Sequence, residues 1–226
     1  ISKIILTSPY FWEEYFSKFI DEDKYMFIPN APSRKIFNRY QKRKHNNFTI
    51  GFIGSVRYVE QLKMLIDSVD ELGNNFKVFI AGGGPGYEDI VEYSQGKNFV
   101  EIYGPYNYEK EIVNLYERVD CVYSVYDTKL KNVKIALPNR LYEAICCEIP
   151  IIAAKGTILG KFIEKEEIGL TVNDTNKGEL KKVLLQLKES SELIKFFQNN
   201  CKKIKANYYD ENNSANLLYE YKMLLK

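Results

Sequence analysis

Short apolar stretches alternate with longer amphipathic ones along most of the chain, and this alternation restricts the possible fold more than any other feature. Residues 48–53 and 76–81 are largely apolar, whereas residues 61–72 between them place leucines and other apolar side chains three and four positions apart. Such short strands, separated by helices, predict βαβ units. Strands that are apolar on both faces are typical of a parallel sheet covered by helices. We therefore predict an α/β fold over residues 48–190: a doubly wound, Rossmann-like parallel sheet with helices on both faces.

The flanking regions predict three further parts. Residues 1–22 show a strand pattern and then a helical one at 11–20, residues 23–47 a short strand and a linker, and residues 191–226 amphipathic helices. No apolar run approaches the ~20 residues that span a bilayer. Because the chain begins with Ile1 inside a strand pattern, we interpret it as part of a longer protein.

Composition excludes several functions. Lys and Arg number 32 against 30 Asp and Glu, which argues against a dedicated nucleic-acid binder. Four cysteines without CxxC spacing and a single histidine, His45, predict no zinc site. We expect the cysteines to be buried apolar residues in a reducing cytoplasm.

Ligands of a doubly wound sheet bind beyond the carboxyl ends of its strands. The first such loop is Gly54-Ser55-Val56-Arg57. A glycine there lets the backbone approach a ligand, and Arg57 is able to pair with a phosphate. The alternative, a turn glycine and a solvated arginine, stays equally open.

The second loop, AGGGPG at 81–86, predicts a tight turn from strand to helix. It fits neither the GxGxxG pattern nor the P-loop, which excludes a P-loop ATPase at this point. Gly83 is a candidate for ligand contact, although a purely structural turn explains the glycines at least as well.

The third loop, YGPYNYEKE at 103–111, contains several tyrosines around a Gly-Pro turn. Tyr103 and Tyr106 are candidates to stack on a nucleobase. The same residues also fit a helix start with Asn107 as its cap, and the two interpretations are compatible.

The segment ALPNRLYEAICCEIPIIAA at 136–154 contributes the most specific site residues. Pro138 and Asn139 begin a helix whose free N–H groups suit a diphosphate, with Arg140 as an added cation. Glu143 lies one turn further on an apolar helix, where a carboxylate requires a partner such as ribose hydroxyls. An ordinary exposed glutamate is the alternative.

In order and spacing, several segments resemble glycosyltransferase family 4, the retaining enzymes of the GT-B fold. The matching segments are IPNAPSRKIF at 28–37, TIGFIGSVRYVEQLKMLID at 49–67, VFIAGGGPGYED at 78–89, FVEIYGPYNYEKEIVNLYERVDCVYSVYD at 99–127, PNRLYEAICCEIPIIAA at 138–154 and KGTILGKFIEKEEIGLTVND at 155–174.

The resemblance implies the C-terminal, nucleotide-sugar-binding domain of a hexosyltransferase that uses UDP- or GDP-sugar and needs no metal or other cofactor. It implies that Glu143 holds the ribose, that the amides of 138–140 and the Gly54 loop face the diphosphate, and that the turn at 103–106 holds the base. Residues 1–22 would be the remnant of an N-terminal domain that binds a polysaccharide or lipid-linked acceptor, so this chain alone is expected to be inactive.

Two positions depart from the family pattern. Ile135 stands where many members carry a glutamate eight residues before the ribose glutamate, and Ser55 and Glu60 replace the usual Arg and Lys of the glycine loop. Arg57, Lys134 or Arg140 then supplies the positive charge. No catalytic residue is assigned, and two alternatives stay open: a UDP-sugar 2-epimerase of the GT-B fold, and a binding module without catalysis.

Basic side chains gather in the predicted linker. They are Arg34, Lys35, Arg39, Lys42, Arg43 and Lys44. A solvated linker is the favoured interpretation, and the alternative is peripheral contact with anionic lipid at the cytoplasmic face of a membrane.

Overall fold

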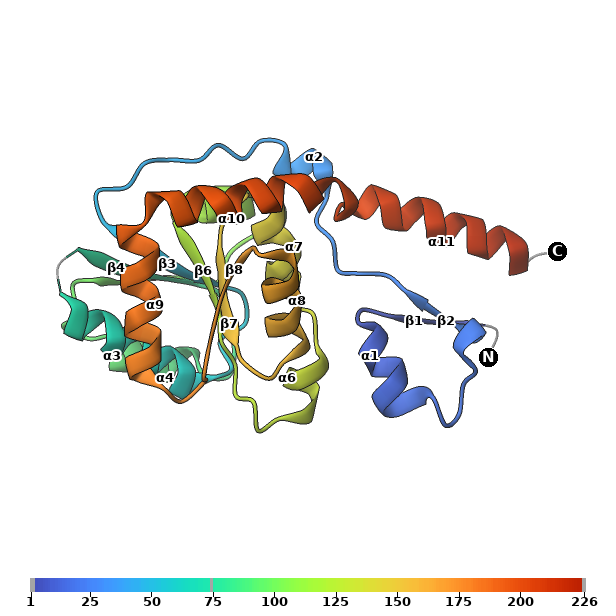
Figure 1. Ribbon diagram of the computed structural model, residues 1–226, viewed down its shortest axis with the longest axis horizontal. Coiled ribbons are helices and arrows are strands. Elements are labelled where there is room, and N and C mark those ends of the chain that lie inside the picture. The colour runs from blue at the N-terminus through green and yellow to red at the C-terminus, as the bar shows by residue number, and fades with distance from the viewer. Residues whose placement is uncertain (1–2, 74, 225–226) are drawn as a thin grey trace.

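The computed structural model describes residues 3–73 and 75–224, and its centre is a six-stranded parallel sheet of order β5-β4-β3-β6-β7-β8 (Figure 1). The strands are β3 (Phe48–Ile53), β4 (Phe76–Ala81), β5 (Val100–Gly104), β6 (Cys121–Ser124), β7 (Ile151–Ala154) and β8 (Gly169–Val172). The order runs outward from β3 in one direction and from β6 in the other. The switch in strand order therefore lies between β3 and β6.

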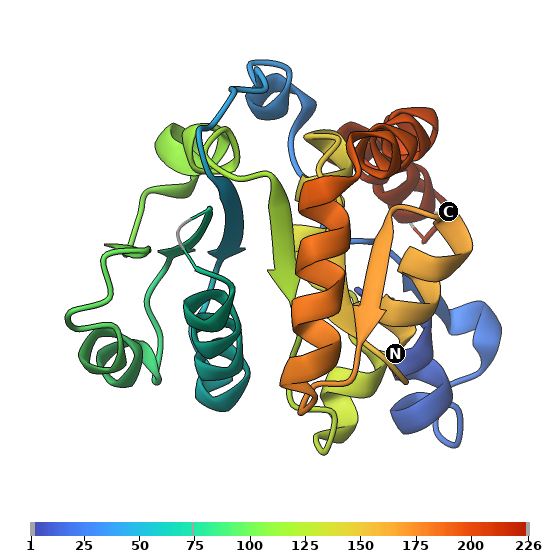
Figure 2. The ribbon, with the colours of Figure 1, turned by 60° about the vertical axis from the view of Figure 1, so that its left-hand side comes forward.

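Helices cover both faces of the sheet, as the sequence predicts (Figure 2). The helices are α1 (Pro9–Phe11), α2 (Arg34–Phe37), α3 (Val59–Leu72), α4 (Tyr87–Tyr93), α5 (Tyr108–Tyr116), α6 (Lys131–Ile135), α7 (Asn139–Cys146), α8 (Ile158–Glu166), α9 (Lys177–Glu189), α10 (Ser191–Ile204) and α11 (Asp210–Leu224).

Two buried apolar clusters lie on the two faces. Successive strand residues point to opposite sides of a sheet. Phe79 accordingly packs with residues of α5, α7 and α8, whereas Ile80 packs with residues of α3, α4 and α9. This is the physical reason why most strand residues are apolar: they face one of two dry cores, and the exposed Lys77 and Glu101 are exceptions.

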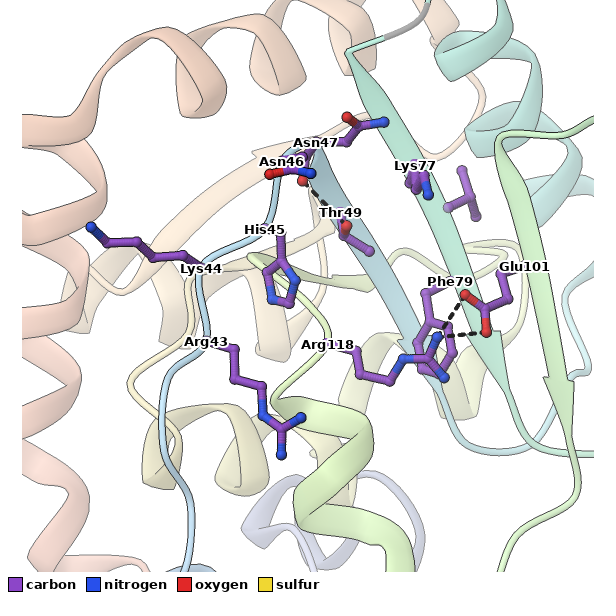
Figure 3. A pocket seen from close by; sticks show the side chains of 11 residues that line it. Arg43, Lys44, His45, Asn46, Asn47, Thr49, Lys77, Phe79, Glu101 and Arg118 are labelled. Carbon is purple, nitrogen blue, oxygen red and sulfur yellow. Dashed lines mark hydrogen bonds and ion pairs between the residues drawn. The ribbon is translucent and has the colours of Figure 1, made fainter.

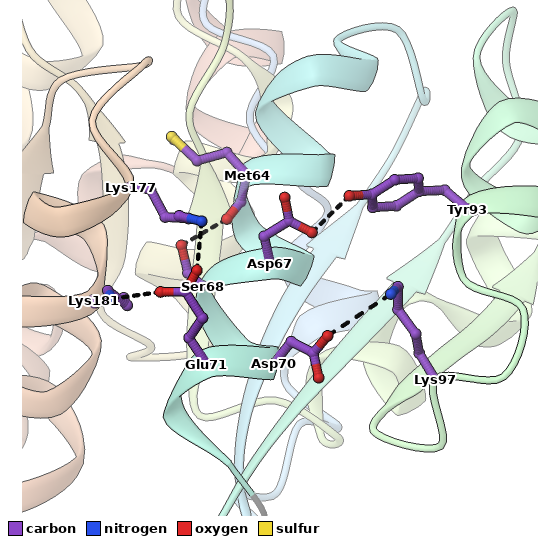
Figure 4. Close-up of polar contacts among 9 residues, drawn as sticks. All are labelled: Met64, Asp67, Ser68, Asp70, Glu71, Tyr93, Lys97, Lys177 and Lys181. Atoms are coloured by element: carbon purple, nitrogen blue, oxygen red, sulfur yellow. Dashed lines mark hydrogen bonds and ion pairs between the residues drawn. The ribbon is translucent and has the colours of Figure 1, made fainter.

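Polar contacts on the outer side of α3 join it to its neighbours (Figure 4). Glu71 accepts hydrogen bonds from Lys177 and Lys181 of α9. The Tyr93 hydroxyl of α4 donates to the Asp67 carboxylate over 2.6 Å. These contacts lie on the exposed side of the helix layer, away from the switch in strand order.

The N-terminal region forms a separate two-stranded parallel sheet of β1 (Ile4–Leu6) and β2 (Tyr25–Phe27). Helix α11 extends back toward it (Figure 1), and Lys3 pairs with Glu220 at 3.0 Å. The domain boundaries suggested by the sequence stay a prediction.

Four local predictions need correction. The helix predicted at 11–20 is a short α-helix followed by the π-helix Trp12–Phe16, and Phe19 is 84% exposed. The wider π turn changes the residue spacing, so the aromatic side chains that a regular helix would place on one face do not form one buried face. They are Phe11, Tyr15, Phe16 and Phe19. The predicted linker contains the helix α2. The helix α6 was not predicted, because five residues give little periodicity. Pro138 is the N-cap of α7 and not its first helical residue.

Candidate functional site

A pocket of about 470 Å³ opens beyond the carboxyl ends of β3 and β6, at the switch in strand order. This is the place where ligands of doubly wound sheets bind. Most of the residues predicted to bind the nucleotide line it, namely Gly54, Ser55, Arg57, Tyr106, Asn139, Arg140 and Glu143. Gly83 and Tyr103 are not among its lining residues. Tertiary structure thus brings together residues that are up to about 90 positions apart in the chain.

The glycines of the first two loops pack backbone against backbone. A Cβ at Gly82, where φ is +128°, would lie 2.0 Å from the carbonyl oxygen of Gly54. A Cβ at Gly84 would lie 2.6 Å from the carbonyl oxygen of Val56, whose N–H donates to the carbonyl of Gly83 over 2.8 Å. These contacts explain the glycine run as a close-packed turn. The contact of Gly83 with ligand stays a prediction.

Arg140 is a buried cation at the wall of the pocket, with 7% of its surface exposed. Its guanidinium carbon lies 4.0 Å from the centre of the Phe52 ring and 5.3 Å from that of Tyr126. Nη1 donates to the carbonyl of Tyr123 over 3.4 Å. Within residues 3–73 and 75–224 no carboxylate forms an ion pair with Arg140. The aromatic rings hold the positive charge in place, and an anion in the pocket would compensate it.

Glu143 is 4% exposed, so the exposed-glutamate alternative is wrong. Its partners are two tyrosines: the Tyr108 hydroxyl donates to Oε1 and the Tyr116 hydroxyl to Oε2, each over 2.7 Å. The expectation that the carboxylate needs a ligand as its partner is therefore corrected, because the protein itself supplies two donors. Burial raises the pKa of Glu143, and the two tyrosine hydrogen bonds and the charge of Arg140 oppose that rise.

The N-terminus of α7 faces the same pocket. Pro138 is the N-cap with an extended backbone, and no side chain caps the helix. Pro138, Asn139 and Arg140 all line the pocket. The first N–H groups of a helix and the positive end of its dipole attract anions. The helix start, the cation and the carboxylate thus occur within one segment of six residues.

The third loop divides between pocket and surface. Tyr106 lines the pocket, and burial raises its pKa to about 12. Tyr103 is 39% exposed, and its hydroxyl donates to Glu111. Asn107 caps α5 by accepting a hydrogen bond from the N–H of Lys110 over 3.2 Å, which confirms the predicted helix start. Of the two tyrosines proposed for the base, Tyr106 is therefore the one in the pocket.

Arg57 lies at the exposed rim of the pocket. Its Nε donates to Ser55 Oγ over 3.1 Å, and it forms no ion pair with any residue in the described part of the chain. The phosphate-binding and solvated interpretations of Arg57 both remain consistent with this position.

Sequence reasoning missed three aromatic or polar contributors. Tyr58 and Tyr126 line the pocket with their rings 4.9 Å apart, and Asn132 of α6 lines it as well. Tyr58 and Tyr126 each follow a predicted strand end by a few residues, which is the signal that would have identified them. Asn132 gave no signal, because α6 itself was not predicted.

A second cavity, of about 500 Å³, lies at the opposite edge of the sheet (Figure 3). Its side chains come from the residues before β3 and from the starts of β4 and β5. Arg118 stacks on Phe79 and pairs with both oxygens of Glu101 at 2.6 and 2.7 Å. Arg43, also in its wall, pairs with Glu117 at 2.5 Å. This cavity is similar in size to the first, but it contains none of the predicted nucleotide-binding residues.

Residues 3–73 and 75–224 contain no group of three or more His, Cys, Asp or Glu residues that could hold a metal ion. They also contain no helix long and apolar enough to cross a membrane.

Residues 33–204 match the family of glycosyl transferases group 1. The chain belongs to this family. The curated succinoglycan biosynthesis protein ExoL of Rhizobium meliloti (strain 1021) is 24% identical over 194 residues, which cover 80% of this chain and 48% of ExoL. This chain therefore spans about half the length of that relative.

Solved structures of glycosyltransferases share the fold. Anabaena Alr3699/HepE in complex with UDP and glucose has a TM-score of 0.79 and 18% identity, covering 98% of this chain and 63% of that chain. Sucrose-phosphate synthase from Thermosynechococcus elongatus has a TM-score of 0.75 and 17% identity, covering 98% and 58%. Together with the parallel sheet flanked by helices, these likenesses show the GT-B type of α/β fold.

Proposed function

We propose that this chain is the donor-binding domain of a retaining glycosyltransferase of family 4, which transfers a hexose from a UDP- or GDP-sugar to a polysaccharide or glycolipid acceptor. The presence of both Arg140 and Glu143 on one buried helix with an uncapped N-terminus supports this proposal most directly. HepE, which shares the fold, has been solved with UDP-glucose.

Each part of a nucleoside diphosphate has a candidate partner among the pocket residues. The N-terminus of α7 and Arg140 suit the diphosphate, since both carry positive charge. Glu143 suits the ribose, because a carboxylate accepts hydrogen bonds from two vicinal hydroxyls. Tyr106 offers a ring face for the base. Gly54 and Ser55 line the same pocket and are proposed to face the diphosphate.

The remaining elements of the proposal concern parts of the protein outside this pocket. The acceptor binds a preceding domain, so this chain alone does not transfer sugar. No metal takes part, and the enzyme works in the cytoplasm. Membrane contact through the basic segment is a weaker element, because three of its arginines have partners within the chain. The backbone N–H of Arg34 donates to the Glu211 carboxylate, and its guanidinium lies over the Tyr209 ring. Arg39 donates to the carbonyl of Glu109, and Arg43 pairs with Glu117.

A thermal-shift screen with UDP, GDP, ADP, CMP and their common sugar conjugates tests the proposal. We expect UDP or GDP to raise the melting temperature of the protein. Glu143→Ala should weaken the binding of that nucleotide by about 1.5–3 kcal/mol, the scale of hydrogen bonds to charged groups. If no nucleoside diphosphate stabilises the protein, the proposal is wrong. Sugar transfer by the full-length protein would separate it from a binding module, and epimerised UDP-sugar would identify a 2-epimerase.

A further inference from the structure

Two tyrosines of α5 donate hydrogen bonds to the Glu143 carboxylate, and only one of them lines the pocket. Tyr108 lines the pocket and is 37% exposed. Tyr116 is fully buried and is not among the lining residues. A hydroxyl that donates to Glu143 without reaching the pocket can influence a ligand only through Glu143.

We propose that Tyr108 and Tyr116 are positioning residues that hold the Glu143 carboxylate in the orientation that accepts the ribose hydroxyls. This inference rests on the proposed function of the pocket. It assigns both residues a positioning role that neither the sequence motif nor the comparisons give them.

The carboxylate has enough hydrogen-bonding capacity to accept from both tyrosines and from the ribose. An ionised carboxylate offers about four lone-pair sites. Tyr108 takes one on Oε1 and Tyr116 takes one on Oε2. One site on each oxygen remains, which matches two vicinal hydroxyls of a ribose. Without the tyrosines the Glu143 side chain would have more rotamers available, and ligand binding would have to fix one of them at an entropic cost.

The two donors are themselves fixed by the core. Tyr116 contacts Phe37 of α2 with ring centres 6.1 Å apart. Ile112 and Leu115 of the same helix are buried against the sheet. Helix α5 therefore cannot rotate independently of the core, and its hydroxyls meet Glu143 at defined points. Packing of this kind is what keeps a binding group in its productive geometry.

The electrostatic surroundings give the tyrosines a second effect. Besides Tyr108 and Tyr116, the titratable and charged groups that act on Glu143 or are acted on by it are Tyr106, Tyr126, Arg140, Cys146 and Cys147. Burial raises the pKa of Glu143, and hydrogen bonds from Tyr116 and Tyr108 lower it. Removing a tyrosine hydroxyl should therefore raise that pKa further, so the accepting form would be lost at a higher pH.

The decisive variant is Tyr116→Phe, which keeps the buried ring and removes the hydroxyl. The measured quantity is the ratio of the dissociation constants of dUDP and UDP, which isolates the contribution of the ribose 2′-hydroxyl. Calorimetry measures this ratio at several pH values from pH 5 to pH 8. We expect the wild-type protein to prefer UDP by about 10-fold or more. Tyr116→Phe should reduce that preference several-fold and move its loss on acidification to higher pH.

A matched control exists at Tyr93, whose hydroxyl donates to the Asp67 carboxylate over 2.6 Å on the outer side of α3 (Figure 4). Tyr93→Phe removes the same kind of tyrosine–carboxylate bond away from the pocket. Its dUDP to UDP ratio and its pH profile should equal those of the wild type. If GDP is the ligand found in the screen, dGDP and GDP replace the uridine pair.

The outcomes separate the two proposals. Equal wild-type affinities for UDP and dUDP, with clear binding of both, would show that Glu143 does not hold the ribose, which contradicts its proposed function. A wild-type preference that persists unchanged in Tyr116→Phe, with the same pH profile, would overturn the positioning role alone. If Tyr116→Phe does not fold, Tyr108→Phe gives the same test, because its ring remains in the pocket wall and only its hydroxyl is lost.

Discussion

Gly54 and Arg140 occupy adjoining space so closely that a Cβ at Gly54 would lie 2.5 Å from Nη2 of Arg140. The φ of Gly54 is +136°, a backbone conformation that side chains of L-residues rarely adopt. The glycine at the end of β3 therefore leaves room for a guanidinium, in addition to allowing a turn.

The first prediction follows from this contact. Gly54→Ala should displace the Arg140 guanidinium and weaken UDP binding by about 10-fold, the loss expected for one charged hydrogen bond. Isothermal calorimetry measures this. Gly96→Ala is the control, because Gly96 also has a positive φ, of +74°, but a Cβ there meets nothing within 4 Å. Gly96→Ala should lower stability without changing UDP affinity, and equal effects of both variants on affinity would contradict the role of the contact.

The second prediction concerns the buried cation. Arg140→Met keeps much of the apolar stem and removes the charge. Because Arg140 has no acidic partner among the described residues, the variant should retain or gain stability. The variant should weaken the binding of UDP by about 10- to 100-fold and the binding of uridine by much less, since only UDP carries the diphosphate. A comparable loss for UDP and uridine would show that Arg140 does not contact the diphosphate.

The third prediction uses the raised pKa of Glu143. A carboxyl group whose pKa is raised in the folded state stabilises the protein at low pH, and this stability is lost as pH rises above 4.5 through the raised value. Glu143→Gln resembles the neutral acid and lacks this loss. Its melting temperature should exceed that of the wild type at pH 8 and approach it at pH 5, while UDP affinity falls about 10-fold. Scanning calorimetry at the two pH values decides the matter: a deficit at pH 8 that disappears at pH 5 would contradict the sign.

The fourth prediction concerns the outer side of α3. Lys177 and Lys181 lower the pKa of Glu71 to about 2, so the stabilisation they give is present above pH 4.5 and is lost as pH falls toward 2. Glu71 is exposed, and both lysines are partly exposed. Glu71→Gln should therefore lower the melting temperature at pH 7 by only about 1–2 °C. The difference should vanish in 1 M NaCl, where the Debye length is about 3 Å. A salt-independent difference would indicate a packing effect.

The sequence determined the sheet and most of its helices, because burial in two dry cores imposes apolar strands and a helical period that are visible in residues such as Ile80 and Leu65. It also identified loops that line the pocket, because parallel strands end at a common edge and glycines mark those ends. It failed at 11–20 and at α6, where a π turn and a five-residue helix leave no regular period.

What only the tertiary structure decided is how the site residues are supported. The sequence indicated Glu143 as a ribose acceptor but gave no sign that Tyr116, 27 positions earlier, donates to it. Nor did the sequence indicate that the Arg140 guanidinium lies over the ring of Phe52 in β3. A periodic pattern records which face of an element is buried. The partner met on that face depends on how the elements cross, and that crossing is fixed by the packing of the whole core.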